Sequence, residues 1–307
     1  MKALVTGGAG FIGSHLVRRL IADGSSVTVV DDLSTGRREN IAGSDIEFVV
    51  RDLSRDPLDD LVKDVDAIFH LAAVPSVPRS VREPLRSHEA AATATLRLLE
   101  AARVAGVGTF VNSSSSSVYG NVARPPMIET MPTLPRSPYA VAKLAAEGYT
   151  RVFAGLHGMR TVSLRYFNVF GPRQDPTSAY AAALPRFITA YARREAPKVF
   201  DDGLQSRDFT HVANVVEANV LAARAPALAG ESVNIAAGEP RSVLDLLHAI
   251  SDVFGYWLEP EFLPARPGDI RDSHADISLA RKLLHYAPVT GFSEGLKETV
   301  AWLRDQA

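Results

Sequence analysis

A tyrosine and a lysine four residues apart are the first candidates for chemistry in this sequence. Tyr139 and Lys143 follow Ser137 and Pro138, which are typical of the N-cap and first position of a helix. The spacing places both side chains on one helix face. A lysine ammonium beside a phenol lowers the phenol pKa from about 10 toward neutrality, as a general acid or base requires. Glu147, four residues beyond Lys143, offers the alternative of an exposed ion pair.

A run of serines, residues 113–117, lies between a predicted strand at 109–112 and the segment Val118-Tyr119-Gly120. A flexible linker is the simplest interpretation of such a run. Its position directly after a predicted strand favours a site instead, because ligands bind at the carboxyl ends of parallel strands. A serine hydroxyl there could share a substrate hydroxyl with Tyr139.

Glycines at positions 7, 8, 10 and 13 follow the predicted strand Lys2–Thr6 and precede a predicted helix. Glycine suits a tight turn, a close approach of a pyrophosphate to backbone amides, and close packing of helix and strand. Asp31 ends a second predicted strand, 18 residues after Gly13, near the spacing of about 20 expected for a ribose-binding acid. The pattern predicts a dinucleotide site.

The carboxylate of Asp31 would accept from ribose hydroxyls and repel a 2′-phosphate, which favours NAD over NADP. Arg37 and Arg38 could hold such a phosphate, but a solvated loop is the simpler interpretation. Asp52 and Leu53, after the third predicted strand, suit the adenine edge, and a turn is an equal alternative for Asp52.

The elements that must position these residues alternate between short β-rich runs and longer amphipathic stretches. Strands are predicted at Lys2–Thr6, 27–30, Glu47–Val50, 67–71, 109–113 and 161–165, with helices such as 15–22 and 90–105 between them. Such alternation predicts an α/β fold of the Rossmann type, with a doubly wound parallel sheet and right-handed crossovers.

Prolines break the pattern after about Phe170 into short helices and irregular segments. We therefore expect residues 1–170 to form an NAD-binding domain. Residues 171–307 would mainly form a smaller C-terminal α/β lobe for the substrate, with the chain crossing between lobes.

The composition excludes several classes of function. The net charge of −2 in 307 residues argues against a nucleic-acid partner. The absence of cysteine removes disulfides and thiolate metal sites, so redox chemistry must come from a bound cofactor, and no metal site is expected. No signal peptide opens the sequence and no apolar run approaches about 18 residues, which predicts a cytoplasmic protein with no membrane partner.

Taken together, these motifs resemble the extended short-chain dehydrogenase/reductase family, in its NAD-dependent epimerase/dehydratase branch. Within that branch they are most similar to the nucleotide-sugar 4-epimerases of the UDP-glucose (UDP-galactose) type. The matching segments span nearly the whole chain: residues 6–14, 30–36, 70–73, 113–120, 137–143, 164–172, 205–212 and 266–278.

The resemblance implies a hydride shuttle. Tyr139 would take the proton of the sugar 4-hydroxyl while hydride passes from carbon 4 to NAD, and the 4-keto sugar would turn over and receive the hydride on its other face. Ser115 falls on the catalytic serine, and Lys143 on the residue that holds the nicotinamide ribose. The implied cofactor-binding residues are Gly7, Gly10, Phe11, Ile12, Gly13, Asp31, Asp32, Ser34, Gly36, Asp52, Leu53, Leu71, Ala72, Ala73, Tyr139 and Lys143.

On the substrate side, the resemblance places Asn168, Arg207 and Arg266 at the diphosphate and Asp269 at the nucleotide ribose. Guanidinium groups suit phosphate oxygens, although a lone arginine is more often a surface charge. Ser273 falls on the position beside the sugar 2-substituent. Its small side chain would leave room for an acetamido group, so we expect UDP-GlcNAc to be accepted as well as UDP-glucose.

Other reactions of the family fit less well. Sugar 4,6-dehydratases carry an Asp-Glu pair where Ser116 and Ser117 stand here, and UDP-glucuronate decarboxylases carry a glutamate at the second of these positions. A nucleotide-sugar reductase or dehydrogenase would share Tyr139 and Lys143 and stays an alternative. A non-catalytic NAD-binding sensor is a further alternative, which the intact Ser115 disfavours.

Two positions depart from the family pattern: Ala91 replaces an asparagine near the cofactor, which could weaken NAD retention, and Ala213 replaces a common aspartate for no reason that we can identify. The Ala- and Leu-rich stretches at 90–105 and 139–155 correspond to the dimer helices of the family. A homodimer is therefore expected, with packing inside the monomer as the alternative.

Overall fold

The computed structural model describes residues 1–121, 124–175, 183–265 and 271–305. Its centre is a sheet of seven parallel strands in the order β11-β6-β5-β4-β1-β2-β3. The strands are β1 (Lys2–Thr6), β2 (Ser26–Asp31), β3 (Glu47–Val50), β4 (Ala67–His70), β5 (Thr109–Ser115), β6 (Arg160–Tyr166) and β11 (Glu231–Ile235). The predicted Rossmann-type sheet is confirmed. All six predicted strands form, while β11 was not predicted.

The sheet is buried on both faces because its strands alternate between two apolar layers. In β1, Ala3 and Val5 belong to one core cluster, whereas Leu4 belongs to the other. Successive side chains of a strand point to opposite faces, so a run of apolar residues is what a two-sided sheet needs.

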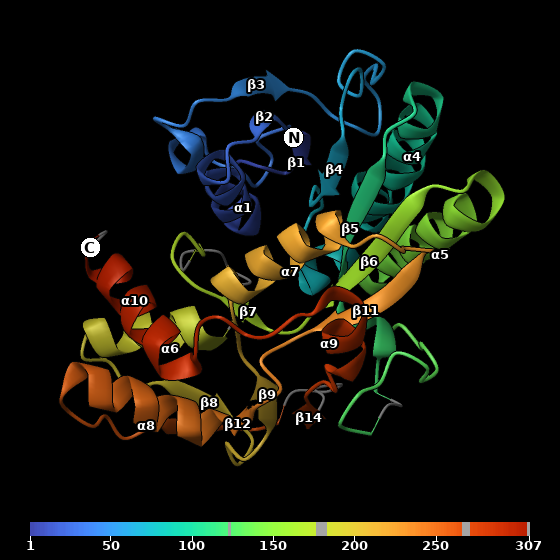
Figure 1. Cartoon of the computed structure of the whole chain (residues 1–307). Helices are drawn as coiled ribbons and strands as arrows, with labels where there is room; N and C mark the ends of the chain where they lie inside the picture. Colours follow the sequence, from blue (N-terminus) through green and yellow to red (C-terminus); the bar gives the residue numbers. More distant parts are fainter. Residues whose placement is uncertain (122–123, 176–182, 266–270, 306–307) are drawn as a thin grey trace.

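Helices cover both faces of the sheet (Figure 1). One layer contains α1 (Phe11–Ala22), α7 (Val212–Arg224) and α9 (Ser278–Leu284), which contribute to the same core cluster. The other contains α4 (Ala94–Ala105) and α5 (Pro138–His157), with the short helices α2 (Val77–Arg82) and α3 (Pro84–His88) beside α5. The helix predicted at 90–105 begins as a π-helical turn, Glu89–Thr93, before α4.

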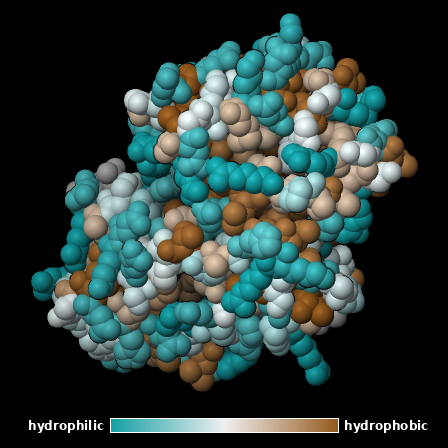
Figure 2. Space-filling model, in the orientation of Figure 1, coloured by the Kyte–Doolittle hydropathy of each residue, from teal (hydrophilic) through white to brown (hydrophobic). Residues whose placement is uncertain are grey.

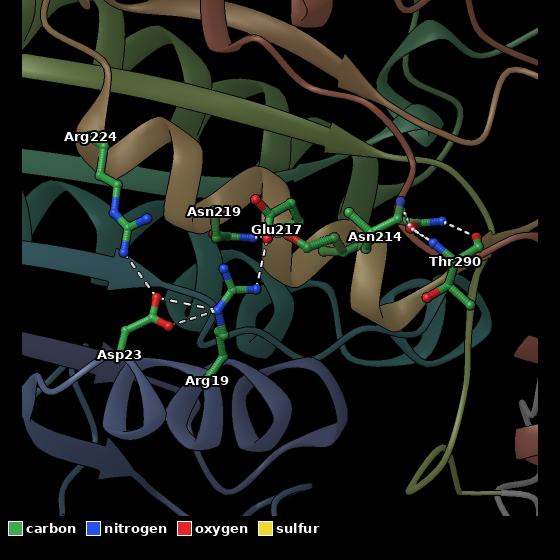
Figure 3. A network of polar contacts seen from close by, with 9 residues as sticks. Arg19, Asp23, Asn214, Glu217, Asn219, Arg224 and Thr290 are labelled. Carbon is green, nitrogen blue, oxygen red and sulfur yellow. Dashed lines mark hydrogen bonds and ion pairs between the residues drawn. The ribbon is translucent and has the colours of Figure 1, made fainter.

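Polar contacts fasten α1 to α7 (Figure 3). Arg19 donates to Glu217 over 2.7 Å, and Arg224 donates to Asp23 over 2.9 Å. At the other end of α7, the amide of Asn214 donates to the carbonyl of Thr290 over 2.9 Å. These contacts join segments from both halves of the sequence across one face of the sheet.

The second lobe is built around α6 (Ala183–Ala192), α8 (Val243–Phe254) and α10 (Phe292–Asp305), which share an apolar core. These helices lie together at the lower left of Figure 1, away from α4 and α5. Short strands complete the lobe: β7 (Val169–Phe170), β8 (Lys198–Phe200), β9 (Ser206–Asp208), β10 (Thr210–His211), β12 (Pro240–Ser242), β13 (Glu261–Leu263) and β14 (Asp272–Ser273).

On the face seen in Figure 2, hydrophilic residues cover most of the periphery and hydrophobic ones gather toward the middle. In the part of the chain that the structure describes, every helix is too short or too polar to cross a membrane.

Candidate active site

The strand order reverses between β1 and β4, and the glycine-rich loop begins at this point. Gly7 has a positive φ of 68°, and a Cβ there would lie 2.8 Å from the backbone nitrogen of Ala72. The backbone of Leu71 donates to the Thr6 carbonyl, and that of Ala72 donates to the Thr6 hydroxyl. The fold thus brings Gly7, Leu71 and Ala72 together where open α/β sheets bind their ligands.

The loop leads directly into the start of α1. Its N-cap, Gly10, has no side chain to occupy the free N–H groups of the first turn, which contains Phe11, Ile12 and Gly13. A Cβ at Gly13 would lie 2.2 Å from the Gly7 carbonyl oxygen, so only glycine permits this approach. Free amides at a helix N-terminus form the site that a pyrophosphate requires.

Asp31 ends β2 beside this loop and is 7% exposed. Its carboxylate accepts from the backbone N–H groups of Ala9 and Leu33 over 3.0 and 2.9 Å. Burial raises the pKa of Asp31, and the two N–H groups oppose that effect. A Cβ at Gly36 would lie 2.7 Å from the same carboxylate. The oxygens keep lone pairs for ribose hydroxyls, so the residues present fit a dinucleotide.

The neighbouring candidates are held in local turns. Asp32 accepts from the backbone of Ser34 over 2.9 Å. Asp52 accepts from the backbone and hydroxyl of Ser54 over 2.9 and 2.6 Å, as a turn residue does, and Leu53 beside it is buried. Burial would raise the pKa of Asp52, but the Ser54 hydrogen bonds and nearby arginines lower it overall.

The arginines after β2 have partners within the protein. Arg37 is paired with Asp175 over 3.0 Å, and the guanidinium of Arg38 lies 4.8 Å from the centre of the Phe48 ring. The segment lies on the surface, but it is not a simple loop, because Arg37 precedes and Arg38 begins a short 3₁₀ helix, Arg38–Ile41.

The end of β5 meets α5 through the serine run. Lys143 donates to the carbonyl and hydroxyl oxygens of Ser113 over 2.7 and 3.3 Å, and the Ser115 hydroxyl is near enough to the Tyr139 phenol to lower its pKa. Ser137 caps α5 by accepting from the backbone of Ala140 over 3.2 Å, as predicted. The structure therefore brings the three predicted catalytic side chains to one place.

One electrostatic expectation about this helix was wrong, and one alternative interpretation is excluded. Burial raises the pKa of the half-buried Tyr139, and the Ser115 hydroxyl offsets this only in part. Lys143 does not lower it, because its ammonium is directed to Ser113. Burial lowers the pKa of Lys143 to about 8, against the opposing effect of Glu147. Glu147 is not an exposed partner of Lys143 either: it is 2% exposed and paired with Arg165 over 2.7 Å.

A buried histidine that the sequence analysis did not single out connects the glycine loop to the π-helical turn. Burial lowers the pKa of His70 to about 3, so the ring is neutral. Its Nε2 lies 3.0 Å from the hydroxyl of Thr95, and its Nδ1 lies 2.8 Å from that of Thr6. Thr95 in turn donates to the carbonyl of Ala91. This series of hydrogen bonds places the ring proton of His70 on Nε2. Ala91 takes part through its backbone carbonyl, where the asparagine usual in the family would contribute a side chain.

Three of the predicted substrate residues also come together. Asn168 donates to the carbonyl of Asp208 over 3.2 Å, and Arg207 precedes Asp208 on β9. Ser273 on β14 is paired with Arg207 in register. Arg207 donates to two backbone carbonyls, of Ser206 and Arg271.

Of these substrate residues, Asn168 lies near the edge of the large sheet that carries the catalytic serine. Ser115 is in register with Tyr166, the last residue of β6, which precedes Asn168 by two positions. Arg266 and Asp269 lie outside the described residues.

The sequence analysis also missed Arg165 and the buried role of Glu147. One signal was available: Arg165 stands in a predicted buried strand, and a charge there requires a buried partner. Glu147, eight residues after Tyr139, is on the helix face that can provide it.

Comparison with known proteins agrees with this geometry. Residues 3–236 match the model of the NAD dependent epimerase/dehydratase family. The chain is 41% identical to a UDP-glucose 4-epimerase of Mycolicibacterium smegmatis, over the full length of both chains.

Solved structures agree over the same length. A UDP-N-acetylglucosamine 4-epimerase from Methanobrevibacter ruminantium, in complex with UDP-N-acetylmuramic acid, has a TM-score of 0.96 and 42% identity, covering 100% of this chain and 99% of that one. A UDP-glucuronic acid 4-epimerase from Bacillus cereus, with UDP-glucuronic acid and NAD, has a TM-score of 0.92 and 33% identity, covering both chains fully.

Proposed function

The chain belongs to the NAD-dependent epimerase/dehydratase family, and we propose that within it the protein is a UDP-sugar 4-epimerase that interconverts UDP-glucose and UDP-galactose. That it is an NAD-dependent nucleotide-sugar epimerase follows from the family and from relatives that cover its whole length. The similarity to the UDP-glucose 4-epimerase of M. smegmatis supports the finer assignment, and Ser115, Tyr139 and Lys143 supply the groups that proton transfer at a sugar hydroxyl needs.

Some residues of the site would bind NAD, and others would transfer the proton of the sugar. The N-terminus of α1 would hold the pyrophosphate of NAD, and Asp31 the adenosine ribose. NAD, when bound there, would supply a reversible hydride acceptor for carbon 4. Tyr139 would remove the proton of the 4-hydroxyl, with Ser115 sharing that hydrogen bond.

Lys143 completes the proton-transfer machinery as the ribose-holding cation. The Tyr139 phenol keeps its proton at neutral pH, because burial raises its pKa. A positive charge placed beside the phenol would lower the pKa of Tyr139 and so favour the phenolate.

We divide the chain accordingly. Residues 1–170 would bind mainly NAD, and residues 171–307 mainly the nucleotide sugar, through Asn168 at the boundary, Arg207 and Ser273. Arg266 and Asp269 would contact the diphosphate and the nucleotide ribose.

Acceptance of an N-acetylated sugar is part of the proposal. Ser273 is small and 7% exposed, and the structural relative from M. ruminantium acts on UDP-N-acetylglucosamine. Turnover of UDP-glucose with none of UDP-GlcNAc would contradict this part alone.

The geometry after the catalytic serine does not favour a dehydratase. Ser117 donates through its backbone and its hydroxyl to Ser115, over 3.2 and 3.0 Å, in the short helix Ser116–Tyr119. A 4,6-dehydratase would need carboxyl groups at Ser116 and Ser117 to move protons at carbons 5 and 6.

A homodimer is proposed from the outer face of α5. Val141, Tyr149, Val152 and Leu156 form an apolar stripe at helical spacing, and Val152 and Leu156 are 49% and 74% exposed. A contiguous exposed apolar stripe is typical of a protein interface.

The direct test is conversion of UDP-galactose to UDP-glucose by the purified protein, followed by chromatography. We expect conversion with wild type and none with Tyr139→Phe, which should still bind NAD. Retained NAD with no conversion of any UDP-sugar by wild type would favour the sensor alternative.

A further inference from the structure

Glu147 is a buried carboxylate to which the proposed reaction assigns no role. It is 2% exposed and accepts four hydrogen bonds from three strands: Ser114 Oγ of β5 over 2.5 Å, Arg165 Nε and Nη2 of β6 over 2.9 and 2.7 Å, and Ser232 Oγ of β11 over 2.9 Å. A carboxylate has about four lone-pair sites, so its hydrogen-bonding capacity is filled.

These contacts lie on the same helix face as the catalytic side chains. Residues 139, 143 and 147 are spaced by four, which aligns them along α5. Each reaches one of three consecutive serines at the end of β5: Tyr139 contacts Ser115, Lys143 contacts Ser113, and Glu147 contacts Ser114. Glu147 therefore holds Ser114, which lies between the two serines that contact Tyr139 and Lys143.

We propose that Glu147 is a positioning residue of the active site: it locks α5 to β5, β6 and β11 and so holds Tyr139 and Lys143 against the end of β5. The proposal rests on the proposed function in one respect, that Lys143 belongs to the catalytic machinery. The geometry of the lock does not depend on which sugar is turned over.

The charged and titratable groups around Lys143 provide a way to observe this positioning. Tyr139 and Glu147 lie on α5, His70 on β4 and Arg165 on β6. His70 is neutral, since burial and the charge of Lys143 lower its pKa to about 3. Glu147 is the group that raises the pKa of Lys143 against the effect of burial.

The test measures the titration of Lys143 itself by NMR. The sequence contains six lysines, so protein labelled with ¹³C and ¹⁵N in lysine gives few NMR signals, and Lys143→Arg assigns the one of interest. In Glu147→Gln the titration midpoint of Lys143 should fall by about one pH unit, as expected for loss of an opposite charge nearby. Glu100→Gln, which removes an exposed carboxylate on α4, should leave the midpoint unchanged.

A second variant separates the effect of Glu147 on Lys143 from the effect of a folding defect. Glu147→Gln leaves the Arg165 charge buried without its partner, which is destabilising, whereas Glu147→Gln/Arg165→Met removes both charges. We expect a smaller fall in the double variant, because loss of the Arg165 charge raises the pKa of a neighbouring lysine and offsets part of the effect. An unchanged midpoint in the double variant would overturn the proposal, whether or not the single variant folds and titrates lower.

Kinetics separates positioning from general stability. In the folded double variant, kcat for UDP-galactose should fall by about tenfold or more with KM little changed, and the alkaline limb of the pH profile should move down with the lysine midpoint. Equal kcat and an unmoved alkaline limb would overturn the positioning role. If wild type converts no UDP-sugar, the proposed function fails, and the NMR titration still decides the effect of Glu147.

Discussion

Burial acts in opposite directions on the two titratable side chains of the catalytic helix. It raises the pKa of Tyr139 and lowers that of Lys143 to about 8. The four-residue spacing correctly predicted that both share a face. It could not predict where the ammonium points, because the Ser113 carbonyl that binds it comes from a distant strand.

Single glycines are the residues that the sequence predicted best, because their role is steric. Replacing Gly13 by alanine places a Cβ 2.2 Å from the Gly7 carbonyl oxygen and must shift the loop or the helix. We expect NAD binding, measured by calorimetry, to weaken by about tenfold or more, a change of about 1.4 kcal/mol. Gly291→Ala is the control, since a Cβ there meets nothing within 4 Å. Equal affinities in the two variants would contradict the assignment of the loop.

At the scale of elements, strands from the first half of the chain were predictable and β11 was not. Glu231–Ile235 contains Ser232 and Asn234, whose alternation with apolar residues suggests solvent exposure. Both are buried instead: Ser232 donates to Glu147, and Asn234 accepts from Tyr119 over 2.7 Å. Buried polar partners from distant segments leave no signal in local periodicity.

The N-cap of α5 gives a prediction at this scale. Ser137→Ala removes the hydrogen bond to the backbone of Ala140 and should lower the free energy of unfolding by about 1 kcal/mol. Urea denaturation measures it. Ser137→Asp, which can still accept that bond, should retain most of the stability, and an equal loss in both variants would contradict the capping role.

The packing of α10 gives a pH dependence. His211 is 2% exposed beside the Phe170 ring, and Gly295 of α10 leaves room for its imidazole. Burial lowers its pKa from 6.5 to about 4. Between these values the unfolded chain binds more protons, so this histidine costs stability as pH falls through that window.

Comparison with His211→Leu isolates the effect. From about pH 7.5 to about pH 5, wild type should lose about 2 kcal/mol of unfolding free energy relative to the variant. Denaturation curves at the two pH values measure the difference. Parallel pH dependence in the two proteins would contradict a neutral, buried His211.

At the scale of the whole molecule, the sequence indicated two lobes but not how the chain returns to the large sheet. After Phe170 it adds α7 and β11 to that sheet and builds the second lobe from α6, α8 and α10. Strand β11 lies next to β6, so a segment far along the chain completes the buried surroundings of Glu147.

The apolar stripe on α5 predicts the oligomeric state. Val152→Arg places a charge in the middle of the proposed interface and should convert a dimer into a monomer with an unchanged fold. Val289→Arg, at a 58% exposed position before α10, is the control. Light scattering after size-exclusion chromatography measures both masses, and a monomeric wild type would contradict the proposed dimer.

The fate of hydrogen at carbon 4 tests the central claim most directly. UDP-galactose deuterated at carbon 4 is incubated with the protein, and the product is examined by mass spectrometry and NMR. A hydride that leaves and returns within one site predicts UDP-glucose with deuterium still at carbon 4, and no product with Tyr139→Phe. Absence of UDP-glucose, or replacement of the deuterium by solvent hydrogen, would contradict it.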